Sequence, residues 1–208
     1  MRALPKRGLV LGAIGTVLIT ASLTMGTAVA SKSDRASFKM QVSGGAAKCL
    51  PNASADVRIR SIGPVELMDV DVKGLPPKTD FDLFVIQVPT APFGVSWYQG
   101  DIETNRNGED HSLFIGRFSI ETFALSPGPA TPPPVHTGGM FPDATEGVTF
   151  KPIHTYHLGL WFNSPADATK AGCPGATTPF NGDHTAGIQV LNTNQFPPDQ
   201  GPLRQVAP

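Results

Sequence analysis

The sequence has little charge and almost no cysteine. Lys, Arg, Asp and Glu make up 16% of the 208 residues, and the basic residues form no cluster. Because binding to a phosphate backbone depends on clustered Lys and Arg, we expect no nucleic-acid partner. The two cysteines, Cys49 and Cys173, are too few and too far apart for a CxxC redox motif or a Cys-rich zinc site.

The motifs of common catalytic sites are also missing. None of the five histidines belongs to a His-Glu-x-x-His motif, and a regular strand would place His154 and His157 on opposite faces. Residues 94–96 begin like the nucleophile elbow of a serine hydrolase, but Trp97 and Tyr98 follow where a glycine is required. We therefore expect no cofactor and favour a protein that is not an enzyme. A secreted metal-dependent or carboxylate-based hydrolase is the alternative.

The first 30 residues have the pattern of a signal peptide. Arg2, Lys6 and Arg7 precede an uncharged apolar run over residues 8–25, which leads to the small-residue triplet 28–30. The run contains Gly and Thr and is shorter than the roughly 20 apolar residues of a membrane-spanning helix. The pattern predicts a secreted, extracellular protein that has no membrane span after cleavage.

The chain after this leader is predicted to form one domain over residues 31–195 and a Pro-rich tail over residues 196–208. Three of the 16 basic residues lie in the leader, so 13 remain against 17 acidic residues. In an oxidising compartment, an even pair of cysteines near opposite ends of a domain predicts a disulfide between Cys49 and Cys173. Two separate buried thiols are the alternative.

The 21 prolines and 22 glycines separate short apolar runs, which is typical of strands and turns. Asn107-Gly108 between two such runs predicts a hairpin, and Leu113 and Ile115 alternate with polar neighbours in its second arm. About eight strands and a single short helix at 165–171 predict an all-β, antiparallel two-sheet β-sandwich of the immunoglobulin/fibronectin kind. The predicted strands cover residues 56–60, 65–72, 80–88, 95–104, 112–123, 149–153, 155–163 and 186–192.

Two resemblances accompany this pattern. Residues 72–83, which contain Gly-Leu-Pro-Pro and then Thr79 and Leu83, resemble the turn that feeds a central strand in fibronectin-type sandwiches, with Phe81 where many such domains have Tyr. Longer stretches are similar to uncharacterised secreted bacterial β-sandwich proteins of unknown function, a resemblance that implies no activity. These stretches are residues 92–101, 157–163 and 172–182.

Acidic and amide side chains lie around the predicted hairpin tip. Asp101 precedes Glu103, Asn105 and Asn107, and the last three residues with Gly108 have the spacing of the first half of a calcium loop. The alternative is a plain hairpin tip, in which Asn and Gly serve turn geometry and the acids are solvated. The second interpretation agrees better with the sequence, because no bidentate acid completes the loop.

Aromatic residues supply the remaining candidates. On the strand 157–162, His157 and Trp161 share a face with Gly159, and Trp97 and Tyr98 lie on another strand. An exposed face of this kind would stack on a sugar ring; alternatively, Trp161 covers Gly159 and packs under a loop. Either way we expect a non-catalytic protein with a binding or structural role at or outside the cell surface. Its partner would be a cell-wall or glycan ligand or another protein.

Overall fold

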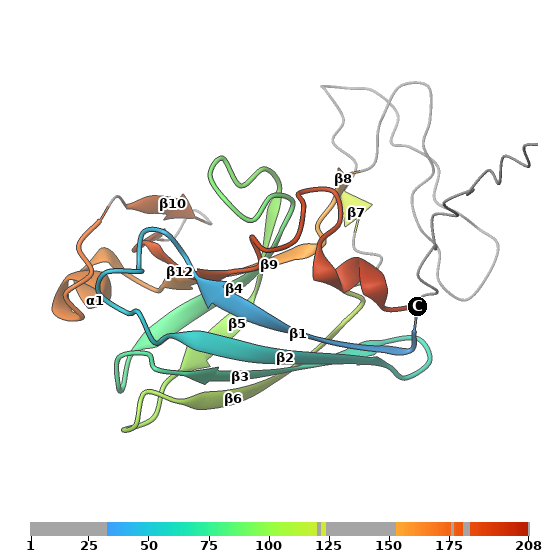
Figure 1. The fold of residues 1–208 in the computed structure, drawn as a ribbon, viewed down its shortest axis with the longest axis horizontal. Helices are drawn as coiled ribbons and strands as arrows, with labels where there is room; N and C mark the ends of the chain where they lie inside the picture. The colour runs from blue at the N-terminus through green and yellow to red at the C-terminus, as the bar shows by residue number, and fades with distance from the viewer. Residues whose placement is uncertain (1–32, 120–121, 124–152, 176, 181–183, 208) are drawn as a thin grey trace, which may run out of the picture. The chain divides into compact units, whose positions relative to one another are not determined.

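The computed structural model describes residues 33–119, 122–123, 153–175, 177–180 and 184–207 (Figure 1). The predicted signal peptide and most of the predicted strand 149–153 lie outside these ranges. Within them, no helix is long and apolar enough to cross a membrane.

The described residues form an all-β fold, as the sequence predicts (Figure 1). Eight strands make one antiparallel sheet in the order β5-β4-β9-β12-β1-β2-β3-β6. Two short pairs, a helix of six residues and a 3-10 helix complete the fold. The elements are β1 (Arg35–Val42), β2 (Ser54–Ser61), β3 (Glu66–Lys73), β4 (Asp80–Ile86), β5 (Ser96–Glu103), β6 (Asp110–Gly116), β7 (Thr122–Phe123), β8 (Ile153–His154), β9 (His157–Phe162), α1 (Pro165–Lys170), β10 (Thr178–Phe180), β11 (His184–Ala186), β12 (Gln189–Asn192) and η1 (Pro202–Gln205).

The sheet is continuous and curls until it is nearly barrel-shaped, so the predicted two-sheet sandwich is not confirmed. Strand β1 joins the two halves, since residues 35–40 pair with β2 and residues 41–42 pair with β12. The two end strands, β5 and β6, approach each other where the sheet nearly closes. A Cβ atom on Gly100 of β5 would lie 2.8 Å from the ring of Phe114 on β6.

The predicted Asn-Gly turn is present, but its arms do not pair with each other. The Asn105 side-chain oxygen accepts the backbone N–H of Asn107 at 2.7 Å, and Gly108 has a φ of +74°, which glycine adopts without strain. After the turn the chain diverges, since β5 pairs with β4 and β6 pairs with β3. The hairpin prediction was therefore right about the turn and wrong about the ladder.

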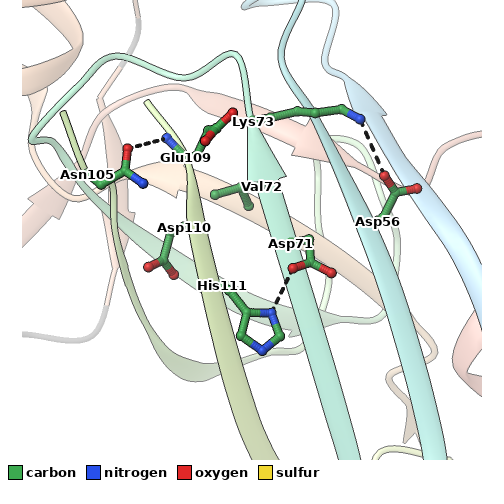
Figure 2. A pocket seen from close by; sticks show the side chains of 8 residues that line it. All are labelled: Asp56, Asp71, Val72, Lys73, Asn105, Glu109, Asp110 and His111. Carbon is green, nitrogen blue, oxygen red and sulfur yellow. Dashed lines mark hydrogen bonds and ion pairs between the residues drawn. The ribbon is translucent and has the colours of Figure 1, made fainter. Parts of the chain in front are cut away.

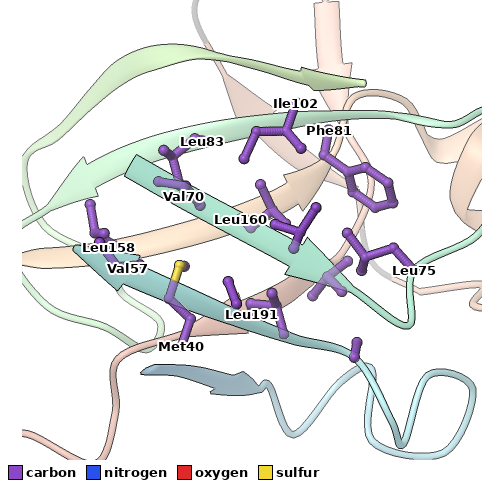
Figure 3. Close-up of a cluster of buried hydrophobic side chains, with 14 of the residues drawn as sticks. Met40, Val57, Val70, Leu75, Phe81, Leu83, Ile102, Leu158, Leu160 and Leu191 are labelled. Atoms are coloured by element: carbon purple, nitrogen blue, oxygen red, sulfur yellow. The ribbon is translucent and has the colours of Figure 1, made fainter. Parts of the chain in front are cut away.

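The core lies on the concave side of the sheet (Figure 3). Alternate residues of each strand point inward, as β9 shows with Leu158, Leu160 and Phe162. In β6 the inward residue is Phe114, opposite buried Met68 of β3, and its chain neighbours Leu113 and Ile115 face outward. The largest fully buried side chains include Phe81, Phe118, Phe162, Met40, Ile59, Met68, Leu83, Ile102, Leu158 and Leu160.

Two long-range connections fix the ends of the domain. Cys49 and Cys173 form the predicted disulfide, with their Cα atoms 5.5 Å apart. The C-terminal segment packs on the sheet: Leu203 and Val206 are buried, and Val206 makes a bridge with Ser33 near the start of the described chain. The segment that the sequence sets apart as a tail therefore contributes side chains to the core.

Candidate functional site

Trp161 is fully buried, so it cannot be the exposed platform that the sequence suggested. Its ring packs edge-on against Phe84 and Phe93, with centroids 5.6 and 5.0 Å away. A Cβ atom on Gly159 would lie 2.3 Å from the indole, which shows that Trp161 occupies the space above this glycine. Loop 87–95, which carries Phe93, covers the outer face of β9, in agreement with the alternative interpretation.

His157 is also fully buried and is therefore not a surface contact residue. Its Nδ1 lies 2.9 Å from the Thr193 hydroxyl, and Nε2 lies 3.1 and 3.2 Å from the carbonyl oxygens of Pro197 and Pro198. Burial lowers the pKa of His157, and these hydrogen bonds oppose that shift only in part. The neutral imidazole therefore fastens the segment after β12 to the sheet.

Trp97 and Tyr98 are exposed, as predicted, on the end strand β5. The exposed fractions are 51% for Trp97 and 39% for Tyr98. The Tyr98 hydroxyl donates to the Asp101 carboxylate at 2.6 Å, and its ring meets Phe84 edge-on with centroids 5.6 Å apart. Partial burial, together with the hydrogen bond to Asp101, raises the pKa of Tyr98, so the phenol stays neutral. Tyr98 and Asp101 therefore form a hydrogen-bonded polar pair on β5.

The exposed apolar side chains gather on the two end strands of the sheet. Of the five large apolar side chains that are exposed in the described ranges, Trp97 and Tyr98 lie on β5, and Leu113 and Ile115 lie on β6. Leu113 is 52% exposed and Ile115 is 62% exposed. The fifth, Ile62, comes after β2 in the turn that leads to β3. We use the name seam surface for the exposed apolar side chains of the two end strands, Trp97, Tyr98, Leu113 and Ile115; as consecutive strand residues, Trp97 and Tyr98 point to opposite sides of β5.

Two of the four candidate metal ligands, Asp101 and Asn105, have local hydrogen-bond partners. Asp101 and Glu103 belong to β5, and Asp101 accepts the hydrogen bond of Tyr98. Asn105 uses its side-chain oxygen to accept backbone N–H groups of Asn107 and Glu109, which is turn geometry. Among the residues that the structure describes, no group of three His, Cys, Asp or Glu side chains is placed to hold a metal ion.

A shallow, open pocket that the sequence did not predict lies on the outer face of β2, β3 and β6 (Figure 2). Its centre is Asp71, which contacts His111 Nδ1 at 2.7 Å and Arg58 at 2.6 Å. Burial alone would raise the pKa of Asp71, but hydrogen bonds from His111 and Arg58 outweigh it and lower the pKa. The pocket is lined by Asp56, Asp71, Val72, Lys73, Asn105, Glu109, Asp110 and His111.

The charges around this pocket are largely matched by neighbours on adjacent strands. Asp56 has a lowered pKa, chiefly because Lys39 donates a hydrogen bond to it, and Lys73 lies 3.6 Å away. Since Lys39, Asp56, Asp71 and His111 stand opposite one another across four strands, they form a cross-strand row. The sequence shows each strand's alternation but not which strands are neighbours, so this row could not be found from it.

Comparison with known proteins adds no assignment: no family model matches the chain, and no curated protein matches its sequence.

Proposed function

We propose that the protein is a secreted, non-catalytic binding protein that works at or outside the cell surface, and that its ligand contacts the seam surface. One observation carries the proposal: four of the five exposed large apolar side chains of the described ranges gather on the two end strands. Exposed large apolar side chains that gather on neighbouring strands indicate a binding surface more often than singly scattered ones do. We keep the immunoglobulin/fibronectin-like sandwich as part of this proposal, with β5-β4-β9-β12 and β1-β2-β3-β6 as its two layers.

The chemistry of β5 favours a glycan as the ligand. An exposed indole stacks on the apolar face of a sugar ring, and Tyr98 and Asp101 of the same strand offer polar atoms for sugar hydroxyl groups. The side chains of Leu113 and Ile115 extend the apolar area along β6. A protein partner would use the same area without depending on the Tyr98–Asp101 pair.

A carboxylate-based hydrolase is the second candidate, because the pocket of Figure 2 holds Asp71 in contact with His111. An aspartate that orients a histidine is half of a general acid–base arrangement. Ser112 comes next in the chain after His111 and donates to Asp110 at 2.5 Å, so its hydroxyl is directed to Asp110 rather than to His111. This candidate would act on the outer face of β3 and β6.

The test is a thermal-shift and pull-down screen of the exported protein against cell-wall and plant glycans, with divalent metals and EDTA in parallel. A ligand that binds only the folded state adds about 2.7 kcal/mol of stability at a hundred times its dissociation constant. We expect a glycan to shift the melting temperature. Trp97→Ala should weaken glycan binding by about two- to ten-fold, since aromatic contacts contribute roughly 0.5–1.5 kcal/mol.

Ile62→Ala is the matched control, because Ile62 is 47% exposed, close to the 51% of Trp97, but lies away from β5 and β6. It should leave glycan binding unchanged. A shift that appears with calcium or zinc and disappears with EDTA would contradict the proposal and support the metal-dependent alternative. Equal loss of binding in both variants would show that the seam surface is not the site.

A further inference from the structure

We propose that the protein has a second binding surface, at the β2–β3 turn and the neighbouring strand ends, which docks on an anionic lipid membrane. This surface consists of Arg35, Arg60, Ile62, Leu67 and Ile115, and we call it the turn surface. It goes beyond the proposed function, because it implies a second partner. Only Ile115 belongs to both surfaces.

Two arginines stand directly opposite each other on this surface. Arg35 of β1 pairs in register with Arg60 of β2, and both are exposed. Like charges at directly opposite positions of an antiparallel pair destabilise it, and an anion between the two would reverse the effect. Arg35 reaches the neighbouring Asp34 at 3.4 Å, while Arg60 forms no ion pair with any residue that the structure describes.

The same cross-strand row continues into apolar side chains. Arg60 is opposite Leu67 of β3, and Leu67 is opposite Ile115 of β6. Ile62, which is 47% exposed, lies in the turn that joins β2 to β3, next to this row. The row passes from two exposed arginines through half-buried Leu67 to exposed Ile115. This order matches the boundary of a membrane, where phosphate groups lie beside acyl chains.

The charges of the sheet face are distributed unevenly. The acidic residues of the face lie toward the other end of the strands, where Asp56 binds Lys39 and Lys73, and Asp71 binds Arg58. The turn end keeps the two facing arginines, of which only Arg35 has an ion pair among the described residues, with the exposed Asp34. The outward charged residues of β1, β2 and β3 are Arg35, Lys39, Arg58, Arg60 and Lys73, against Asp56, Asp69 and Asp71.

The apolar residues decide between two sources of negative charge. A soluble polyanion would use Arg35 and Arg60 but would gain nothing from Ile62, whereas a lipid surface buries an aliphatic side chain and gains from both. The surface is therefore assigned to lipid. Each arginine near an anionic membrane contributes about 1 kcal/mol, which corresponds to about a five-fold change in binding.

The test is cosedimentation of the exported protein with vesicles of phosphatidylglycerol and phosphatidylcholine in equal amounts, and with vesicles of phosphatidylcholine alone. We expect binding to the mixed vesicles only. Arg35→Gln with Arg60→Gln should weaken it about 25-fold, and Ile62→Ser should weaken it without any change of charge. All proteins carry the same processed N-terminus, so the leader cannot account for a difference.

The matched control is Lys39→Gln with Lys73→Gln, which removes the same charge from the same sheet face but at the Asp56 end. It should weaken vesicle binding no more than about two-fold, because exposed charges farther than a Debye length are screened. Equal losses in the two double variants would overturn the proposal, since net charge alone would explain them. Binding to vesicles of phosphatidylcholine alone would also overturn the proposal. Binding to dextran sulfate that needs the two arginines but not Ile62 would overturn it too, since a soluble polyanion would then be the ligand. Thermal melting verifies that each variant is folded.

Discussion

His157 makes the stability of the domain depend on pH. In the folded protein burial holds the pKa of this imidazole below its ordinary value of 6.5. In the unfolded chain the imidazole is solvated and titrates near 6.5. Below that pH the unfolded state therefore takes up a proton that the folded state does not bind, and acid favours unfolding.

The direction and the size of the pH effect on stability result from this difference between the folded-state and unfolded-state pKa of His157. The contribution of neutral His157 is fully present above about pH 6.5 and is lost as the pH falls from there toward the lowered pKa of the folded state. One proton of difference gives at most about 1.4 kcal/mol of unfolding free energy per pH unit. Protonation would also require the Thr193 hydroxyl, which donates to Nδ1 in the neutral state, to turn its hydrogen elsewhere.

The assay is urea unfolding at a series of pH values, with the wild type and His157→Gln compared. At about pH 8 the variant should be less stable by about 1–3 kcal/mol, because Thr193 and the Pro197 carbonyl lose buried hydrogen-bond partners. Its pH dependence between about 6.5 and 5 should be flatter than that of the wild type. Parallel curves for the wild type and His157→Gln would refute the reasoning.

Two further predictions concern packing and covalent closure. Replacing Cys49 and Cys173 together by Ala should lower the unfolding free energy by up to about 4–5 kcal/mol, since the disulfide spans a sequence separation of 124. A melting temperature equal to that of the oxidised wild type would contradict this prediction. Gly159→Ala should lower the free energy of unfolding by about 1–3 kcal/mol, because the new methyl group would lie 2.3 Å from the buried Trp161 ring. Urea unfolding measures this loss, and a loss below about 0.5 kcal/mol would show that the indole has room to move.

The strands and the disulfide could be predicted because their signals are local or chemical. Period-two alternation identifies β2 and β3, and the runs that form β4 and β9 are apolar enough to be central strands. The cysteine pair is predicted by the number of cysteines and the expected compartment. Neither inference needs to know which strands are neighbours in the sheet.

The sequence is less informative where the structure depends on which strands or loops are neighbours in the fold. In β6 both faces carry apolar residues, and only the pairing of Phe114 with Met68 sets Phe114 inside and Leu113 and Ile115 outside. Similarly, the alternation of β9 places Trp161 opposite the core face, but only the tertiary structure brings Phe93 over it. Alternation gives two faces, and long-range contacts decide which one is covered.

The candidate site could be predicted only in part for the same reason. Trp97 and Tyr98 could be named from the sequence as surface candidates on one strand, and both are exposed. Their association with β6, and the partners of Asp71 on β2 and β6, depend on strand order. Strand order in an antiparallel sheet is fixed by non-local contacts, which a single sequence does not display.

The strand order also determines when the domain can assemble. Strands β3 and β4 are consecutive in the chain, yet β9, β12, β1 and β2 lie between them in the sheet. The N-terminal strands form one segment of sheet and β4-β5 another, and they are joined only when β9 and β12 pair with β4 and β1. A chain exported from its N-terminus, as we propose, therefore cannot complete its fold until residues 189–192 have crossed the membrane. The last strand in chain order, β12, is thus the closing element of the sheet.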